Sequence, residues 1–292
     1  MSYYRDNLET LTFEEYLKRR FKPSTIKSYL YLLEPFHFQI KDPVNAKLDD
    51  LYFFLECVKK NPCTTLCAMK QYYNYLLFTQ KIKRHPLKKF SLRRPKKPVQ
   101  FQDLFDQKEL DYLLNRPVRY SMLEYRNKAI LSLLIYHGLT SENIIRIRLD
   151  DIDLAEGEMY LLQGTRSVRR IIELNEKQIE YIEKYLADER PKIAKSQQRV
   201  LFLNKLGDPM TVDGLFRMVK PMNNYFPDRV LNPKTIRQSV TRNLTNELRM
   251  PLVKVQQITG HKRISSILNY RSPDMKEMRA ILLEFHPMDR FL

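Results

Sequence analysis

The sequence predicts a mainly α-helical chain with an all-helical unit over residues 8–86 and a mixed α+β unit over residues 106–292. Three observations support this prediction. Apolar residues recur at helical spacing through most of the chain. The pattern becomes strand-like only between residues 158 and 204. A basic segment with prolines separates the two units, and proline disfavours helix in the residue before it.

The first unit is expected to hold four helices. The second of them is typical: Ile26, Tyr29, Leu30 and Leu33 repeat on one face, and the Ser24/Thr25 pair ahead of them is a helix-cap signal. The same spacing recurs in the other three segments. The four predicted helices cover residues 11–20, 23–36, 48–60 and 64–80.

The segment between the two units, residues 87–105, is predicted to be an extended basic linker. The stretch 81–100, which overlaps it, holds nine Lys or Arg, three prolines and no acidic residue. Such a segment is well suited to cross a phosphate backbone; the alternative is a solubilising spacer. The residues expected to bind DNA are Lys88, Lys89, Arg93, Arg94, Lys96 and Lys97.

The second unit is expected to begin with helices over residues 106–116 and 122–138. Asp106 opens the first of these helices, and Gly138 ends the second with a residue type that readily leaves the helical conformation. A helix then three short strands follow, and from residue 232 the chain is helical again. The helix covers residues 141–149, and the strands cover 158–164, 167–174 and 199–204.

Composition excludes several classes of function. No run approaches the 18 apolar residues of a membrane span, and the N-terminus lacks a signal-peptide pattern, so we expect a cytoplasmic protein. Cys57, Cys63 and Cys67 are too few for a disulfide framework and lack the partners of a zinc set. We therefore expect no metal and no small-molecule cofactor.

The net charge of +17 indicates a polyanionic partner. DNA, RNA and an anionic membrane all satisfy this condition. Membrane binding would need a basic amphipathic helix with a bulky apolar face. Here the positive charge is spread over the chain and peaks in one segment, which favours nucleic acid.

Four polar residues near the C-terminus suggest a chemistry. Lys234 and Arg237 are three residues apart and share a helix face. His261 directly follows Gly260, which is predicted to end a helix, and Tyr270 lies nine residues further on. Two cations, a histidine and a tyrosine suit attack of a tyrosine oxygen on a phosphodiester. The structural alternatives are that Tyr270 packs in the core, His261 caps a helix, Arg237 forms a salt bridge and Lys234 is an ordinary solvated lysine.

The order K-x-x-R, then G-H, then Y resembles the C-terminal box of the tyrosine recombinase (phage integrase) family, in its Xer-like two-domain form. LLIYHGLTSENIIRIRLDDIDL and YLLQGTRSVRRIIEL resemble two further family segments, and residues 8–86 resemble the family's core-binding domain. The resemblance implies a SAM-like helical domain and an α+β catalytic domain with a small antiparallel sheet. Together they would clamp double-stranded DNA and use no metal.

The resemblance also implies a role for each residue of the box. Tyr270 would be the nucleophile that forms a 3′-phosphotyrosyl link. Arg237 would bind the non-bridging phosphate oxygens, and His261 would donate a hydrogen bond to the same phosphate. Lys234 stands where most recombinases have histidine and the poxvirus type IB topoisomerases have lysine, so it is expected to be a proton donor or charge clamp.

Three positions depart from the family pattern. Thr140 replaces the first arginine, Thr165 replaces the hairpin lysine, and Asn143 stands where an acid is usual, with Glu142 close by. Threonine cannot supply the planar fork that matches two phosphate oxygens. Losing one such donor costs about 10²–10³ in rate, and losing a general acid costs about 10²–10⁴.

Neighbouring arginines are candidates to compensate. On the hairpin, Arg166 is expected to supply charge rather than a proton, because an arginine pKa stays above about 12; Arg169 and Arg170 are further candidates there. Arg146 and Arg148 are candidates for the missing clamp, although their distance along the helix would require a shifted helix.

Two functions follow, with a third less favoured. The first is a working site-specific recombinase, as found in integration and mobile elements. The second is a catalytically degenerate DNA-binding protein that acts as the accessory partner of an active relative. The third is a general nucleic-acid-binding protein without strand exchange. The retained tyrosine favours the first, and Thr140 and Thr165 favour the second.

The C-terminal tail carries an apolar helical stripe. Packing on its own domain is the simple interpretation, whereas the resemblance implies packing on a neighbouring protomer in a homo- or hetero-tetramer on two DNA sites. The stripe consists of Met275, Met278, Ile281, Leu282 and Phe285.

Overall fold

The computed structural model describes residues 11–93, 101–116, 123–195 and 198–271. The chain forms two compact units, Met1–Lys97 and Pro98–Leu292, each with its own hydrophobic core. The tail stripe of residues 275–285 lies outside the described residues. Among the described residues, no helix has both the length and the apolar character needed to cross a membrane.

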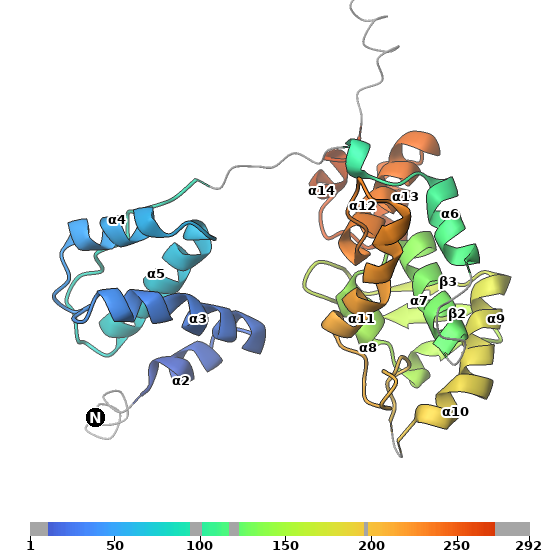
Figure 1. Ribbon diagram of the computed structural model, residues 1–292, viewed down its shortest axis with the longest axis horizontal. Coiled ribbons are helices and arrows are strands. Elements are labelled where there is room, and N and C mark those ends of the chain that lie inside the picture. Colours follow the sequence, from blue (N-terminus) through green and yellow to red (C-terminus); the bar gives the residue numbers. More distant parts are fainter. Residues whose placement is uncertain (1–10, 94–100, 117–122, 196–197, 272–292) are drawn as a thin grey trace, which may run out of the picture. The chain divides into compact units, whose positions relative to one another are not determined.

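The first unit is helical, as predicted (Figure 1). Its core includes the fully buried side chains Leu17, Phe36, Leu51 and Met69, one from each helix. The Ser24/Thr25 cap prediction is wrong: Lys22 is the N-cap residue, and Pro23 begins the helix, where its missing N–H costs nothing. The helices are α2 (Phe13–Lys18), α3 (Pro23–Gln39), α4 (Leu48–Cys57) and α5 (Pro62–Phe78).

Both compact units extend into the segment 87–105 that was predicted to be a linker. Leu87 is fully buried in the core of the first unit, and Phe105 is fully buried in the core of the second. Apolar side chains at both ends of the basic segment therefore anchor it. Lys88, Lys89 and Arg93 are exposed. The other three residues expected to bind DNA, Arg94, Lys96 and Lys97, lie outside the described residues.

The second unit combines helices with a small antiparallel sheet in the order β1-β2-β3. The strands are β1 (Ile152–Asp153), β2 (Glu158–Leu161) and β3 (Arg170–Glu173), with Met159 opposite Ile172. The predicted antiparallel sheet is confirmed, but the strand expected over residues 199–204 is wrong. That segment forms only isolated bridges, from Val200 to Arg148 and from Leu203 to Pro209, because its partners are single residues of loops.

Within the described part of the second unit the α-helices are α6 (Gln107–Asn115), α7 (Glu124–His137), α8 (Ser141–Arg146), α9 (Glu176–Lys184), α10 (Arg190–Ile193), α11 (Val212–Val219), α12 (Pro233–Arg242), α13 (Leu252–Thr259) and α14 (Ser265–Leu268). Short 3-10 turns η1 (Phe101–Asp103), η3 (Leu149–Asp151) and η5 (Lys220–Tyr225) and π-helical turns η4 (Tyr185–Glu189) and η6 (Asn243–Glu247) connect or extend them.

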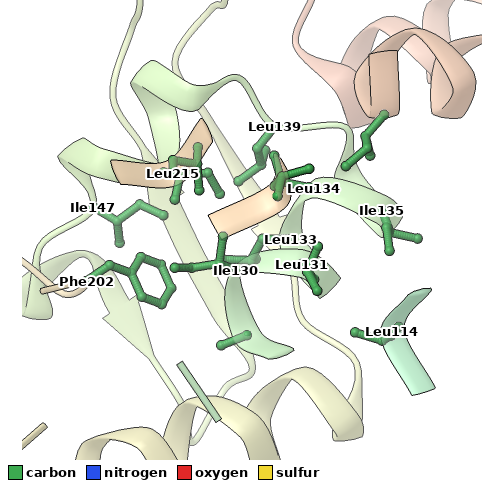
Figure 2. Close-up of a cluster of buried hydrophobic side chains, with 14 of the residues drawn as sticks. Leu114, Ile130, Leu131, Leu133, Leu134, Ile135, Leu139, Ile147, Phe202 and Leu215 are labelled. Carbon is green, nitrogen blue, oxygen red and sulfur yellow. The ribbon is translucent and has the colours of Figure 1, made fainter. Parts of the chain in front are cut away.

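Helix α7 is the central element of this unit. Its sequence is apolar on nearly every side, which is typical of a helix surrounded by others. Ile130, Leu133 and Leu134 are fully buried, and Figure 2 shows these side chains among Leu215 of α11, Phe202 and Leu139. Helices α6, α9 and α12 pack on α7. Gly138 ends α7 in the left-handed conformation, at φ 57°, as its sequence predicted.

Candidate active site

The site is built around the turn that follows α13. Gly260 ends this helix at φ 69°, and its N–H donates to Gln256 O at 2.7 Å. The hairpin between β2 and β3 docks on the turn: Ser167 bridges His261, and Val168 N–H donates to Gly260 O at 3.0 Å. Segments about 90 residues apart in sequence, 167–170 and 258–261, are thereby held side by side.

Arg237 reaches this turn from α12. Its Nη1 donates to Thr259 O at 2.6 Å and also to Gly138 O, so one guanidinium joins the ends of α13 and α7. Its Nη2 is buried and has no hydrogen-bond partner among the described residues. Burial lowers the pKa of Arg237 to about 10, which still leaves it charged at neutral pH.

Arg170, the first residue of β3, lies on the same turn. Its Nε donates to Ile258 O at 3.1 Å and its Nη1 to Val168 O at 3.5 Å. Burial, and then the charge of Arg237, lower the pKa of Arg170 to about 10. A Cβ on residue 260 would lie 2.0 Å from Nη1 of Arg170. Glycine is therefore favoured at this position by its backbone conformation, and any other side chain would push the Arg170 guanidinium aside.

His261 is held beside both arginines. Its Nδ1 lies 2.6 Å from Thr259 Oγ1, and that hydroxyl donates to Val255 O, also at 2.6 Å. Because the hydroxyl has one proton and gives it to the carbonyl, Nδ1–H of the imidazole must be the donor to Oγ1. Burial, then Arg237 and Arg170, lower the pKa of His261 to about 3. The imidazole is thus neutral at pH 7, and its Nε2 is a hydrogen-bond acceptor.

Tyr270 follows α14 and is fixed at both its backbone and its side chain. Gln238 Nε2 donates to the phenol oxygen at 3.2 Å, and Asn246 Nδ2 donates to the carbonyl at 2.8 Å. Gln238 is the residue after Arg237 on α12, so the tyrosine hydroxyl is held next to the position from which the arginine extends. The structure therefore brings Tyr270, Arg237 and His261 together.

Among the described residues, neither Lys234 nor Arg166 makes a hydrogen bond or ion pair to this cluster. Lys234 is exposed in the first turn of α12, where Asn232 caps the helix by accepting from the Lys234 and Thr235 N–H groups at 2.9 and 3.0 Å. Arg166 is exposed on the hairpin turn. Both side chains are free to meet a ligand, and their roles stay predictions.

The two threonines that differ from the family pattern, Thr140 and Thr165, form structural hydrogen bonds. Thr140 is the N-cap of α8: its hydroxyl accepts the Asn143 N–H at 3.2 Å and donates to Asn143 Oδ1 at 2.7 Å. Thr165 donates its backbone N–H to Glu142 Oε2 at 2.7 Å and its hydroxyl to Oε1 at 3.2 Å. Glu142 therefore fixes the hairpin turn, and neither threonine replaces the missing cation.

The arginines considered for the missing clamp lie elsewhere. Arg146 pairs with Glu142 at 3.3 Å and donates to Gln163 O at the same distance. Arg148 is the N-cap residue of η3, and its N–H donates to Asp151 Oδ2 at 2.8 Å. Arg146 is thus already used to hold the hairpin against α8, and among the described residues Arg148 makes no hydrogen bond or ion pair to the turn. Instead, Arg170 is the residue placed beside Arg237.

Comparison with known proteins identifies the family of the chain. Residues 103–277, more than half of the chain, match the phage integrase family. The chain therefore belongs to the phage integrase family of tyrosine recombinases.

Curated relatives include the tyrosine recombinase XerD of Staphylococcus haemolyticus. It is 27% identical over 298 residues, spanning 96% of this chain and 99% of the relative. XerD of Halalkalibacterium halodurans is 34% identical over 181 residues, which are 61% of this chain and 60% of that protein. The first match extends through both compact units.

Solved structures share the fold. XerH site-specific recombinase, bound to its difH substrate in a pre-cleavage complex, gives a TM-score of 0.67 at 19% identity, covering 88% of this chain and 78% of that one. A lambda integrase dimer bound to a COC′ core site gives 0.63 at 12% identity, covering 94% and 95%. The fold class predicted from the sequence is confirmed.

Two site residues were not assigned from the sequence. Thr259 orients His261, and Gln238 holds the Tyr270 hydroxyl. Proximity to His261 and Arg237 in the sequence was the available signal, but threonine and glutamine are common on helices and their side-chain directions were unknown. For Arg170, the sequence suggests only a replacement for the hairpin lysine.

Proposed function

We propose that this chain is a site-specific DNA recombinase that cuts and rejoins double-stranded DNA through a 3′-phosphotyrosyl intermediate. The observation that supports it best is the meeting of Arg237, His261 and Tyr270 around the end of α13. Thr259 contacts both Arg237 and His261, and Gln238 links Tyr270 to α12. Family membership and the DNA-bound relatives of the same fold support the same conclusion.

The reaction exchanges one phosphate ester for another. The Tyr270 oxygen attacks phosphorus and forms a P–O bond while the bond to the 5′ oxygen breaks. The electron pair of that bond goes to the 5′ oxygen, which takes up a proton, and the tyrosine loses its own. Arg237 binds the non-bridging oxygens, whose negative charge grows in the transition state. Attack by a 5′ hydroxyl of another strand reverses the step and rejoins the DNA.

Lys234 and Arg166 are the proposed additions to the cluster when DNA is bound. Lys234 lies three residues before Arg237 on α12 and is exposed, so its ammonium group can reach a phosphate as a proton donor or a charge clamp. Arg166 would supply positive charge from the hairpin turn. The exposed Lys88, Lys89 and Arg93, with Arg94, Lys96 and Lys97, would bind the DNA backbone.

The proton position on His261 refines its proposed role. Donation from Nε2 to a phosphate requires an imidazolium, since Nδ1 already carries the proton of the neutral ring. A bound phosphate offsets the two arginine charges that lower the His261 pKa, and so favours protonation. We propose that His261 gains this proton on binding DNA and then donates to the phosphate.

The wider setting of the reaction is proposed from the family. Strand exchange needs four active sites on two DNA sites, which a homo- or hetero-tetramer supplies. The reaction would take place in the cytoplasm on chromosomal or mobile-element DNA. The two units would act as core-binding and catalytic domains, without metal or small-molecule cofactor.

Covalent trapping tests the proposed function. The protein is incubated with nicked suicide duplexes made from the DNA that flanks its gene, and products are separated on a denaturing gel. A protein–DNA adduct is expected with the wild type and not with Tyr270→Phe, which keeps the ring and removes the nucleophile. Absence of an adduct on duplexes that footprinting shows to be bound would contradict recombinase activity.

The second candidate is a DNA-binding accessory partner without activity, and Thr140 and Thr165 favour it. Thr140→Arg with Thr165→Lys restores both family residues and tests it. An adduct that appears only in the restored variant would support the accessory role. An adduct with the wild type would exclude it.

A further inference from the structure

Arg170 and Arg237 bind consecutive carbonyl groups of one turn. Arg170 Nε donates to Ile258 O at 3.1 Å, and Arg237 Nη1 donates to Thr259 O at 2.6 Å. The guanidinium of Arg170 also packs directly on the backbone of Gly260. The two cations are therefore neighbours, although one comes from β3 and the other from α12.

Each of these guanidiniums has one buried nitrogen whose N–H groups are not hydrogen-bonded. Nη2 of Arg170 and Nη2 of Arg237 are inaccessible to solvent and have no hydrogen-bond partner among the described residues. No carboxylate of these residues is ion-paired with either arginine. By contrast, Arg229 pairs with Glu109. Two adjacent, partly buried cations without a counter-ion destabilise a fold, and an anion that binds both offsets this cost.

Arg116 also has an unpaired buried Nη1, but its surroundings differ. Its guanidinium lies over the Tyr225 ring, 3.6 Å from the centroid, so an aromatic face already compensates the charge. The α13 turn differs from the surroundings of Arg116 because two neighbouring guanidiniums there each have an unpaired hydrogen-bond donor.

We propose that Arg170 is the second phosphate-binding arginine of the active site and fills the role that Thr140 leaves open. Its chemical role rests on the proposed recombinase function. In this role Arg170 and Arg237 together bind the non-bridging oxygens of the scissile phosphate, and Arg170 reaches them from the sheet rather than from the start of α8. The hairpin that carries Arg170 is fixed to that helix by Glu142 and Asn143.

The first test measures anion binding and does not depend on recombinase activity. Thermal unfolding is followed with inorganic phosphate and with chloride at equal ionic strength. A ligand that binds only the folded state raises the unfolding temperature. The wild type and Arg199→Ala, which removes an equal charge from an exposed loop position, are expected to show the same phosphate-specific rise. Arg170→Ala and Arg237→Ala are expected to lose most of it.

The second test measures the reaction. At saturating duplex, Arg170→Ala is expected to form the covalent adduct about 10²–10³-fold more slowly than the wild type, the usual cost of one oxyanion donor, while Arg199→Ala keeps the wild-type rate. A duplex with a methylphosphonate at the scissile position removes the phosphate charge, so the loss in Arg170→Ala should shrink about tenfold or more there. A residue that only supports the fold would give the same loss on both duplexes.

The outcomes separate this inference from the proposed function. A phosphate-specific rise that Arg170→Ala abolishes, with no adduct from the wild type, would support the two-arginine anion site and reject recombination. A phosphate response and adduct rate in Arg170→Ala equal to those of Arg199→Ala would overturn the inference. Should Arg170→Ala not fold, Arg170→Lys keeps the charge without the planar fork. The same two measurements then apply, and the rate of adduct formation is expected to fall at least about tenfold.

Discussion

The second unit holds the arginine of α7 and the two arginines at the α13 turn in different ways. Arg126, only 6% exposed, donates through Nε and Nη2 to Asn127 Oδ1 at 3.1 and 2.7 Å and through Nη1 to Leu203 O at 2.8 Å. Arg170 and Arg237 are only partly buried, yet each has one buried nitrogen without a partner among the described residues. A structural arginine is satisfied by the fold, whereas a binding arginine keeps a donor for its ligand.

The largest expected effect tests the binding side of this comparison. Arg237→Ala should lower the rate of adduct formation about 10²–10³-fold, because a preorganised donor to the phosphate oxygens is lost. The rate is measured by single-turnover trapping on a suicide duplex. Equal rates for Arg237→Ala and Arg199→Ala would mean that Arg237 does not contact the phosphate.

The structural side predicts a loss of stability instead. Arg126→Ala should lower the free energy of unfolding by about 2–3 kcal/mol, since Leu203 O and Asn127 lose a charged hydrogen-bond partner inside the core. Urea unfolding followed by circular dichroism measures it. If Arg170→Ala lowered the free energy of unfolding as much as Arg126→Ala, the distinction between a structural and a binding arginine would be wrong.

Acid should destabilise the second unit through its two shielded histidines. Burial lowers the pKa of His137 to about 4, and burial and two arginines lower that of His261 to about 3. The unfolded chain has pKa values near 6.5, so below that pH it binds more protons than the folded chain. The stability that the two neutral imidazoles contribute is fully present above pH 6.5. It is lost as the pH falls toward 4 for His137 and 3 for His261, by at most about 1.4 kcal/mol per pH unit for each imidazole.

Urea unfolding between pH 7 and pH 4.5 checks this slope. His137→Gln should flatten it while leaving Arg170 and Arg237 in place. A slope unchanged by this substitution would show that the imidazole is not held neutral.

The smallest expected effect sharpens the assignment of the second arginine. Thr140→Arg removes the N-cap of α8 and should cost about 1 kcal/mol of stability. With Arg170 already beside Arg237, it should raise the adduct rate less than about tenfold. A rise of two orders of magnitude or more would mean that the clamp was vacant in the wild type.

The sequence was sufficient for features whose causes are local. Gly138 and Gly260 end their helices as predicted, and Asp106 caps α6 by accepting the Glu109 N–H at 2.8 Å. Each depends on a few consecutive residues. The helices α9 and α11 were not predicted, although Asn175 and Thr211 cap them, because their short apolar patterns border loops.

The part of the site that could not be predicted depends on distant contacts. Nothing in the sequence near Arg170 shows that Ser167 will bridge His261, 94 residues away in number. The periodicity of a sequence predicts which face of a strand is buried, but it does not predict which distant segment packs against that strand. Sequence order therefore favours Arg146 and Arg148 for the missing clamp, since they follow Thr140, whereas in the structure it is Arg170 that lies beside Arg237.

The carbonyl groups that hold the two arginines have a property beyond their positions. Ile258 and Thr259 are the last residues of α13, and Gly138 caps α7, so these oxygens lie at the negative ends of two helix dipoles. A carboxylate in the same place would cancel a full unit of positive charge and compete with the phosphate. The partial charge of each helix end, about half a unit, anchors the guanidiniums and cancels less of their field than a carboxylate would.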